Sequence, residues 1–331
     1  MSSGKTITLN TGHKMPSQGF GTLFIPDVAN TVFETLKIGY RHLDLAKVYQ
    51  NQRDVGVGIK RALAEIPGLK REDIFVASKL WNHKHRPEDV EKALDDTLEE
   101  LGLEYLDLYL IHWPVAFVPG DNLFPVKAGV TPPEADLDLS VSATQTWKAM
   151  IDLPKSKVRS IGVSNFTPEQ LDIIIKETGV TPAVNQVERH PCLPQPELLD
   201  YCANKGIAIV GYSAFGNNDV GEPLLINHPD IKATAQRLSS VRGKPTSPAQ
   251  VIIAWSQLGG ISVIPKSGNP ERIAENFDEI ELDEEAINSI TEIGKDHRRF
   301  NIPWLYKGGR WDVNLFNEEV EKEAKGKAIL V

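Results

Sequence analysis

The sequence contains little cysteine, no long apolar run and no excess of basic residues. Cys192 and Cys202 cannot form a disulfide framework and lie at no metal-ligand spacing, so we expect buried, reduced thiols and no metal centre. No stretch approaches the roughly 18 apolar residues that span a bilayer. The beginning, MSSGKTITLN, lacks the apolar core of a secretory signal, which predicts a soluble, cytoplasmic protein without a membrane partner. The net charge of −9 argues against nucleic acid as a partner.

A glycine-rich dinucleotide turn is also missing, because no GxGxxG occurs in the sequence. Gly56-Val57-Gly58 lies within a helical pattern and is interpreted as two tolerated helix glycines. Short β-branched runs alternate with longer amphipathic segments, and this happens eight times. The predicted strands are residues 19–22, 42–45, 74–79, 106–112, 160–164, 183–187, 207–213 and 261–266. This repeat predicts an α/β fold, the (β/α)8 TIM barrel, rather than an open doubly wound sheet.

Three segments depart from the repeat. Residues 6–9 and 15–17 flank a turn and predict an N-terminal β-hairpin that plugs the bottom of the barrel. Residues 113–140 form a long connection after the fourth strand, and connections of that length are often functional. Residues 297–331 mix aromatic side chains with glycine and arginine and predict a C-terminal loop over the barrel mouth. Because no linker separates these parts, we expect residues 1–331 to form one domain, with the barrel at about 6–300.

Polar residues end three consecutive predicted strands, where active sites of this fold lie. Asp44, Lys79 and His112 are roughly one strand–helix unit apart, and Tyr49 follows Asp44 closely, so we expect all four at one rim. Singly, they fit a helix cap, a snorkelling lysine, a core histidine and a half-buried aromatic. Together they predict a proton-donating system: Lys79 lowers the pKa of Tyr49, Asp44 keeps Lys79 charged, and His112 orients a carbonyl oxygen.

Motifs along most of the chain share one pattern. They are Gly19-Phe20-Gly21-Thr22, Gly39-Tyr40-Arg41-His42-Leu43-Asp44 with Tyr49 and Asn51, Ser78-Lys79, Leu110-Ile111-His112-Trp113-Pro114, Ile161-Gly162-Val163-Ser164-Asn165-Phe166 and Ile264-Pro265-Lys266-Ser267. This set resembles the aldo-keto reductase family. Within the family, residues 212–218 and 310–312 are similar to fungal polyol-pathway reductases acting on glyceraldehyde, glycerol and small sugars. The resemblance implies reversible, NADPH-dependent reduction of short hydroxylated aldehydes to polyols.

The resemblance also implies the site residues. NADPH would bind without a Rossmann fold and deliver hydride to the carbonyl carbon, next to a catalytic tetrad of Asp44, Tyr49, Lys79 and His112, in which Tyr49 gives the proton. The implied cofactor-binding residues are Ser164, Asn165 and Gln186 at the carboxamide, Tyr212 at the ring, Lys266, Ser267 and Arg272 at the adenosine phosphate, Glu275 and Asn276 at the adenine, and Ser213, which is assigned to no particular part of the cofactor. Cations at the last strand–helix junction suit a dianionic 2′-phosphate, although a solvated loop would also contain them. Gly268-Asn269 replaces the usual Val-Thr, so NADH is expected to bind more weakly than NADPH rather than not at all.

The substrate pocket is predicted from an apolar set with few polar groups. Its members are Leu23, Trp81, Trp113, Phe117 and Trp304, for which packing at the barrel rim is the alternative role. Many relatives have a tryptophan where this sequence has Leu23, so the pocket is expected to be wider there. Polar Asn217 and Asn218 would pair with substrate hydroxyls.

Two other functions stay open at this point. Lys79 could form a Schiff base in an aldolase-type barrel if its pKa were depressed, although Asp44 argues against this. The chain could instead be a non-catalytic, NADPH-binding regulatory subunit, which an intact tetrad disfavours. No dimer helix is apparent in the sequence, so we expect a monomer.

Overall fold

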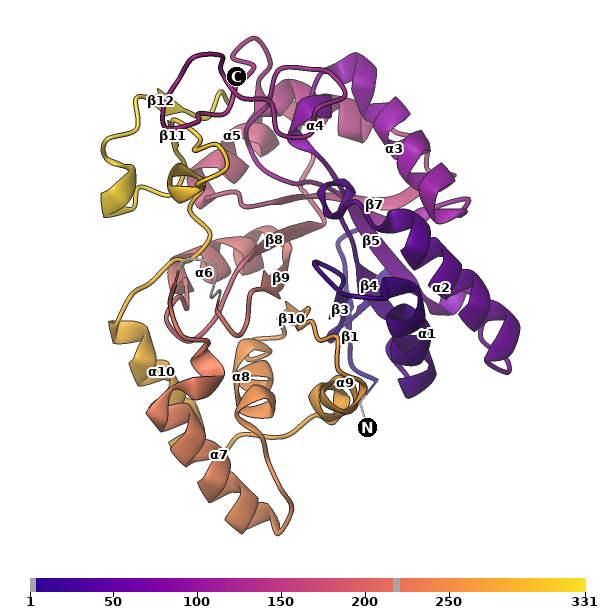
Figure 1. The fold of residues 1–331 in the computed structure, drawn as a ribbon, viewed down its shortest axis with the longest axis vertical. Helices are drawn as coiled ribbons and strands as arrows, with labels where there is room; N and C mark the ends of the chain where they lie inside the picture. Colours follow the sequence, from indigo (N-terminus) through magenta and orange to yellow (C-terminus); the bar gives the residue numbers. More distant parts are fainter. Residues whose placement is uncertain (1–3, 217–220) are drawn as a thin grey trace.

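Eight parallel strands form the central sheet of the computed structural model, which describes residues 4–216 and 221–331. They are β3 (Phe20–Gly21), β4 (His42–Asp44), β5 (Phe75–Leu80), β6 (Leu106–Ile111), β7 (Val158–Ser164), β8 (Val184–Glu188), β9 (Ala208–Tyr212) and β10 (Ser262–Val263). Each strand pairs with the next one along the chain. Hydrogen bonds from Gly19 N to Val263 O (2.9 Å) and from Gly21 N to Pro265 O (3.2 Å) join the two ends of the sheet. The (β/α)8 barrel is therefore confirmed (Figure 1).

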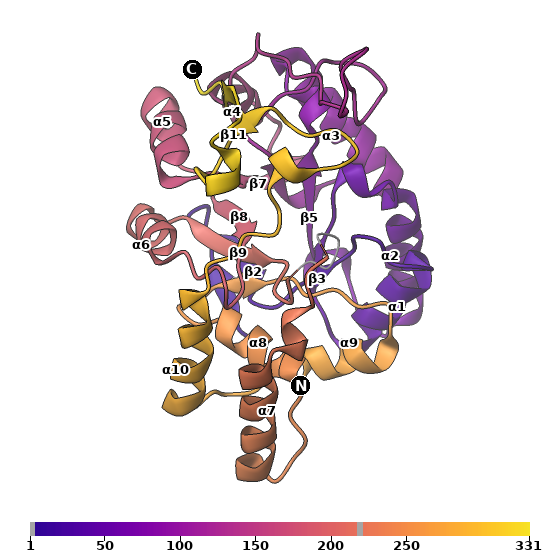
Figure 2. The same cartoon turned by 60° about the vertical axis from the view of Figure 1, so that its left-hand side comes forward.

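Helices surround these strands as an outer layer (Figures 1 and 2). They are α1 (Val28–Ile38), α2 (Gln52–Glu65), α3 (Pro87–Leu101), α4 (Ala143–Ile151), α5 (Pro168–Thr178), α6 (Pro196–Lys205), α7 (Pro229–Arg242), α8 (Pro248–Ser256), α9 (Pro270–Phe277) and α10 (Glu284–Glu292). Local signals set the ends of α3, because Pro87 opens it and Gly102 ends it with φ 64°. No helix within residues 4–216 and 221–331 is long and apolar enough to cross a membrane.

Gly56 and Gly58 lie within α2, as the helical pattern predicts. A Cβ on Gly56 would lie 2.4 Å from Leu101 O at the end of α3, and one on Gly58 would lie 2.5 Å from Ala29 O in α1. Both neighbouring helices therefore approach α2 more closely than any side chain allows. The two glycines are required by helix packing and are not merely tolerated.

The N-terminal hairpin closes the bottom of the barrel. β1 (Thr6–Thr8) pairs antiparallel with β2 (Lys14–Pro16). Met15 is fully buried in a cluster that includes Ala77 and Leu110 from the barrel strands. Asn10 Nδ2 also donates a 3.0 Å hydrogen bond to Pro182 O. The predicted plug is therefore present.

Alternation along the strands determines which side chains enter the barrel. Ala77 and Leu110 belong to the interior cluster, whereas Val76 packs in the cluster beneath the helices. Successive side chains in a strand point to opposite faces. Lys79 and His112, each two positions further along, therefore face the interior at the carboxyl ends of their strands.

The long connection 113–140 and the C-terminal segment pack together at the barrel mouth. Trp113 and Trp311 share one buried cluster. The segment contains β11 (Val313–Asn314), which pairs with β12 (Gly326–Lys327). Its last residues accept hydrogen bonds from the first turn of α4, and Figure 2 shows the segment in yellow beside this helix. This agrees with the C-terminal loop predicted over the mouth.

Candidate active site

A buried ion pair stands at the carboxyl ends of β4 and β5. Lys79 Nζ donates hydrogen bonds to Asp44 Oδ1 at 2.6 Å and to Leu45 O at 2.7 Å. Both charged side chains are only 1% exposed, so each depends on the other for stabilisation. Burial by itself lowers the pKa of Lys79, but Asp44 and Tyr49 outweigh burial and raise this pKa above its ordinary value. The lysine is therefore charged at neutral pH, which argues against a Schiff-base role.

Tyr49 lies next to this pair on η1 (Lys47–Tyr49), a single turn of 3-10 helix. Lys79 Nζ is 5.3 Å from the centre of the phenol ring. Burial raises the pKa of Tyr49, Lys79 lowers it and Asp44 raises it, and the sum lies above the ordinary value. Lys79 thus lowers the pKa of Tyr49 as predicted, but burial outweighs the cation and the resulting pKa is raised. A phenol that stays protonated at neutral pH is still a suitable proton donor.

His112 completes the group from the position after β6. Its ring centroid is 6.3 Å from that of Tyr49 and 5.0 Å from that of Trp81. Burial lowers the pKa of His112 well below its ordinary value, and the charges of Lys79 and His85 lower it further. The imidazole is therefore neutral at neutral pH and can donate one hydrogen bond to a carbonyl oxygen. Among the described residues, its Nδ1 has no hydrogen-bond partner.

Amide and hydroxyl groups near the ends of β7 and β8 form hydrogen bonds next to the ion pair of Asp44 and Lys79. Gln186 Nε2 donates a 2.7 Å hydrogen bond to Asp44 Oδ2. Ser164 Oγ donates to Gln186 O at 2.8 Å. Both side chains are almost fully buried. Gln186 thus lies directly against Asp44 of the ion pair, and Ser164 lies next to Gln186.

Asn165 links Tyr212, the predicted ring-binding residue, to His112. It adopts a left-handed conformation, with φ 66°, and its Nδ2 donates to His112 O at 2.9 Å. Its Oδ1 accepts a 2.7 Å hydrogen bond from Tyr212 OH. Ser213, the next residue, also has a positive φ of 52° and accepts from Asn301 Nδ2 at 3.3 Å. These residues surround one side of the barrel mouth.

The predicted phosphate-binding residues lie at the start of α9. Lys266 and Arg272 are exposed, and Ser267 is half-buried. Asn269 caps the helix by accepting a 3.0 Å hydrogen bond from Arg272 N. Two exposed cations beside a helix N-terminus form a setting that suits an anion.

Glu275 and Asn276 follow on the same helix but differ in exposure. Glu275 is exposed, whereas Asn276 is 5% exposed. Asn276 accepts a hydrogen bond from Gln18 through its backbone, and in the described part of the chain its Oδ1 has no partner. Their contact with an adenine stays a prediction.

Aromatic side chains form a wall beside His112. Trp81, Trp113 and Phe117 are buried, and their rings lie 6.3, 5.2 and 4.9 Å from that of Trp311. Trp311 is absent from the predicted pocket, although it lies in the 310–312 motif that resembles polyol-pathway reductases. The C-terminal segment is rich in polar residues and has no periodic apolar pattern. The sequence therefore does not indicate which of its aromatic side chains faces the barrel mouth.

The other predicted pocket residues are placed differently. Trp304, on η7 (Pro303–Leu305), is half-buried and lies outside the buried cluster around Trp311, with the Arg310 guanidinium 4.6 Å above its ring. Leu23 is half-buried in the connection after β3. Asn217 and Asn218 lie outside the described residues.

Glu188, at the end of β8, is a site residue that the sequence prediction misses. This fully buried carboxylate accepts hydrogen bonds from His190 Nε2 (2.8 Å), Phe300 N (2.8 Å) and Asn301 N (2.9 Å). It therefore fixes the start of the C-terminal segment to the barrel. Its strand-end position, equivalent to that of Asp44, is the signal that could have identified it.

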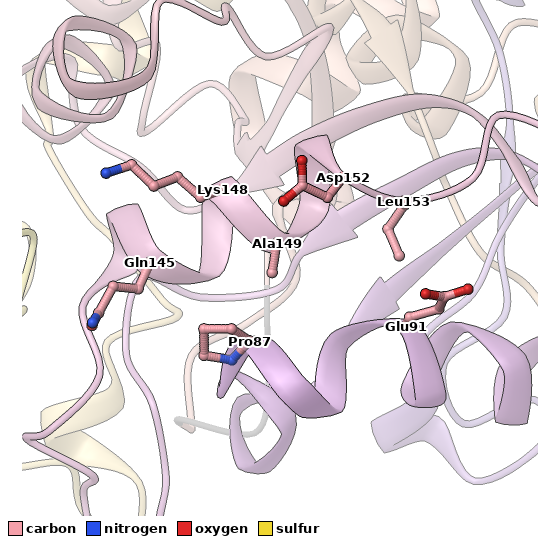
Figure 3. A pocket seen from close by; sticks show the side chains of 7 residues that line it. All are labelled: Pro87, Glu91, Gln145, Lys148, Ala149, Asp152 and Leu153. Atoms are coloured by element: carbon pink, nitrogen blue, oxygen red, sulfur yellow. The ribbon is translucent and has the colours of Figure 1, made fainter.

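Two recesses lie away from the tetrad. One, of about 300 Å³, lies between α3 and α4 and is lined by Pro87, Glu91, Gln145, Lys148, Ala149, Asp152 and Leu153 (Figure 3). The other, of about 650 Å³, lies at the hairpin end of the barrel and is lined in part by Lys14, Phe75 and Asp107. The lining of both recesses, as far as the chain is described, includes no predicted site residue. The candidate active site is therefore the mouth around the tetrad.

Comparison with known proteins identifies the family. Residues 12–295 match the model of the aldo/keto reductase family. The chain belongs to this family. The reductase is 63% identical over 332 residues to D/L-glyceraldehyde reductase of Hypocrea jecorina, covering 100% of this chain and 99% of that protein. It is 41% identical to NADPH-dependent D-xylose reductase of Meyerozyma guilliermondii, covering 90% and 97% of the two chains.

A solved structure agrees with this assignment. Aldose reductase from Schistosoma japonicum matches with a TM-score of 0.83 and 35% identity, covering 95% of this chain and 99% of that one. The resemblance seen in the sequence is confirmed, and the protein is an oxidoreductase.

Proposed function

We propose that this reductase converts short hydroxylated aldehydes, such as glyceraldehyde and small aldoses, reversibly into polyols with NADPH. The observation that carries the proposal is the buried Lys79, whose Nζ lies 2.6 Å from Asp44 Oδ1 and 5.3 Å from the centre of the Tyr49 ring. The similar proteins are named as a D/L-glyceraldehyde reductase and an NADPH-dependent D-xylose reductase, which supports this substrate and cofactor class.

The residues present fit NADPH, which supplies the hydride for the carbonyl carbon when it is bound. Two features support this fit: the exposed cations at the start of α9 and, within the described residues, the unpartnered Oδ1 of buried Asn276. The proposed roles assign the carboxamide to Ser164, Asn165 and Gln186, the ring to Tyr212, the 2′-phosphate to Lys266, Ser267 and Arg272, and the adenine to Glu275 and Asn276, with Ser213 assigned to no particular part of the cofactor. NADH lacks the 2′-phosphate and therefore binds more weakly.

Proton transfer is assigned to Tyr49. Its protonated hydroxyl donates to the carbonyl oxygen, and the charged Lys79 stabilises the phenolate that remains. Asp44 keeps Lys79 charged and in place. His112, as a neutral imidazole, orients the carbonyl oxygen by donating a hydrogen bond. The raised pKa of Lys79 opposes the Schiff-base alternative, which requires a neutral amine.

The pocket accounts for the proposed substrate size. The rings of Trp81, Trp113 and Phe117 form one buried wall, and Trp311 closes it. We propose that Leu23 leaves room on the side of β3, because it stands where many relatives have a tryptophan. Each hydroxyl of a bound substrate needs a polar partner, because an unpaired buried hydroxyl costs about 1–3 kcal/mol.

A substrate panel tests the proposal. Aldehydes and polyols are assayed by absorbance with NADPH and with NADH, and we expect the highest kcat/KM for glyceraldehyde and small aldoses with NADPH. A preference for bulky apolar aldehydes or steroid ketones above about tenfold in kcat/KM would refute the substrate class. Failure to oxidise NADPH with any aldehyde would favour the regulatory-subunit alternative, and borohydride trapping of a Lys79–substrate adduct would favour the Schiff-base alternative.

We further propose a single-domain, cytoplasmic monomer. The sequence shows no apparent dimer helix, and this is the ground for proposing a monomer. Light scattering after size exclusion tests this, because a mass of twice 36.7 kDa would contradict it.

A further inference from the structure

Tyr49 depends on its surroundings for its position, because η1 is only one turn long. Such short 3-10 turns have poor hydrogen-bond geometry and little stability of their own. The Tyr49 amide donates to Ala46 O at 3.0 Å, and the following Gln50 already leaves the helix with φ 56°. Other groups must therefore hold the phenol close enough to Lys79 for the ammonium to stabilise the phenolate that proton transfer leaves.

One carboxylate outside the barrel wall holds both sides of this turn. Glu100 lies at the end of α3, and its Oε1 accepts from Lys47 Nζ at 2.6 Å. Its Oε2 accepts from Gln52 Nε2 at 2.8 Å. Lys47 precedes Tyr49 on η1, and Gln52 begins α2 just after it. Glu100 therefore clamps the segment 47–52 that carries the phenol.

The same network reaches the strand that carries Lys79. Ser78 Oγ donates a 2.6 Å hydrogen bond to Gln52 Oε1. This fixes the orientation of the Gln52 amide, because the reversed amide would place its oxygen against the Glu100 carboxylate. Ser78 and Gln52 are 0% and 2% exposed. Ser78 faces outward between α2 and the sheet, whereas Lys79 faces inward.

We propose that Glu100 is a positioning residue for proton transfer. Through Lys47, Gln52 and Ser78 it fixes the Tyr49 hydroxyl relative to the Lys79 ammonium from the opposite side of the barrel wall. This inference rests on the role proposed for Tyr49. Glu100 pairs with Lys47 and Gln52 and with none of the residues proposed to bind substrate or cofactor, so its loss should affect the proton step and leave NADPH binding intact.

The test compares two variants on the same helix. Glu100→Gln interrupts the network, while Glu91→Gln removes an ion pair with Lys157 (2.9 Å) whose carboxylate side chain is 53% exposed and lines the recess in Figure 3. Both replace one α3 carboxylate by an amide, and only Glu100 connects to η1. Glu91→Gln is expected to have wild-type kcat.

For Glu100→Gln we expect kcat with glyceraldehyde to fall about tenfold, since small misplacements at a reacting centre have effects of that size or larger. The solvent deuterium isotope effect on kcat should rise, because proton transfer becomes more rate-limiting. The NADPH Kd, measured by fluorescence, should stay within about twofold. Ser78→Ala should act in the same direction, and the double variant should be no worse than the stronger single variant, because both interrupt one network.

Several outcomes would overturn the inference. In the first, Glu100→Gln has a kcat within about twofold of wild type and an unchanged solvent isotope effect. In the second, Glu91→Gln loses as much kcat as Glu100→Gln. If thermal denaturation shows that Glu100→Gln is not folded, kcat and the solvent isotope effect are measured for Lys47→Met and Ser78→Ala instead. Tyr49→Phe, assayed in parallel, separates the two proposals: an active Tyr49→Phe refutes the proposed role of Tyr49, whereas an inactive Tyr49→Phe with a fully active Glu100→Gln refutes the positioning role alone.

Discussion

Gln186 donates a 2.7 Å hydrogen bond to Asp44, on the carboxylate oxygen that Lys79 does not use. Asp44 thus connects a residue proposed to hold the nicotinamide carboxamide with the lysine proposed to act on Tyr49. Solvent does not weaken this connection, because all three connected side chains are buried. One carboxylate therefore contacts both the residue proposed to hold the cofactor and the lysine proposed to act on the proton donor.

Replacing Gln186 by leucine should impair both cofactor binding and turnover. The variant leaves a buried carboxylate oxygen without its donor, a loss of about 1–3 kcal/mol, or roughly five- to a hundredfold. NADPH titration by fluorescence and kcat at saturating NADPH measure the two effects separately. Weaker NADPH binding with a wild-type kcat would show that the link does not reach the proton donor.

Tyr49→Phe should abolish most turnover while NADPH still binds. The substitution removes the proton donor but little volume, and we expect a loss of roughly 10²–10⁴-fold in kcat. Steady-state rates with glyceraldehyde and a fluorescence titration with NADPH check this. If the variant retains more than about half of kcat with chemistry rate-limiting, Tyr49 is not the acid.

The pH profiles of the two directions should differ. Reduction needs a protonated Tyr49, whose pKa lies above the ordinary phenol value of about 10, so its kcat/KM should stay flat through neutral pH and fall only in strong alkali. Polyol oxidation needs the phenolate and should rise with pH. Lys79→Met removes the cation that lowers this pKa, so the rise should move to higher pH. A reduction rate that already falls between about pH 6 and 8 would contradict the assignment.

The sequence predicted the parts of this site that depend on strand period. Asp44, Lys79 and His112 end consecutive parallel strands, and parallel strands in a closed barrel necessarily bring those ends to one rim. The interior position of Lys79 then follows from alternation after Ala77. Neither inference needs knowledge of contacts between distant segments.

The remaining features depend on tertiary contacts that no local pattern reveals. The pKa of Tyr49 rises because burial outweighs Lys79, and burial is set by the whole barrel mouth. Trp311, rather than Trp304, joins the aromatic wall. The backbone amide of the preceding Arg310 donates to Pro133 O, a contact between segments far apart in the sequence. Glu100 lies on a different helix from the η1 turn that it holds.

Arg272→Ala should weaken NADPH far more than NADH. Only NADPH offers a 2′-phosphate to the guanidinium, and a charge-assisted pair contributes about 1.5–3 kcal/mol, which corresponds to roughly ten- to a hundredfold in Kd. Titrations with both cofactors measure the difference. Equal losses for NADPH and NADH would show instead that Arg272 supports the fold or a phosphate common to both.

Leu23→Trp should narrow the substrate pocket selectively. Leu23 is half-buried after β3 and is proposed to line the pocket, where an indole would fill the room that the leucine is expected to leave. KM should therefore rise most for the longer aldoses and least for glyceraldehyde, because only the longer chains reach that side. Steady-state kinetics over aldoses of increasing length, with Leu23→Met as a volume-matched control, test this. An equal rise in KM for all chain lengths would place Leu23 outside the pocket, because a wall residue must discriminate by size.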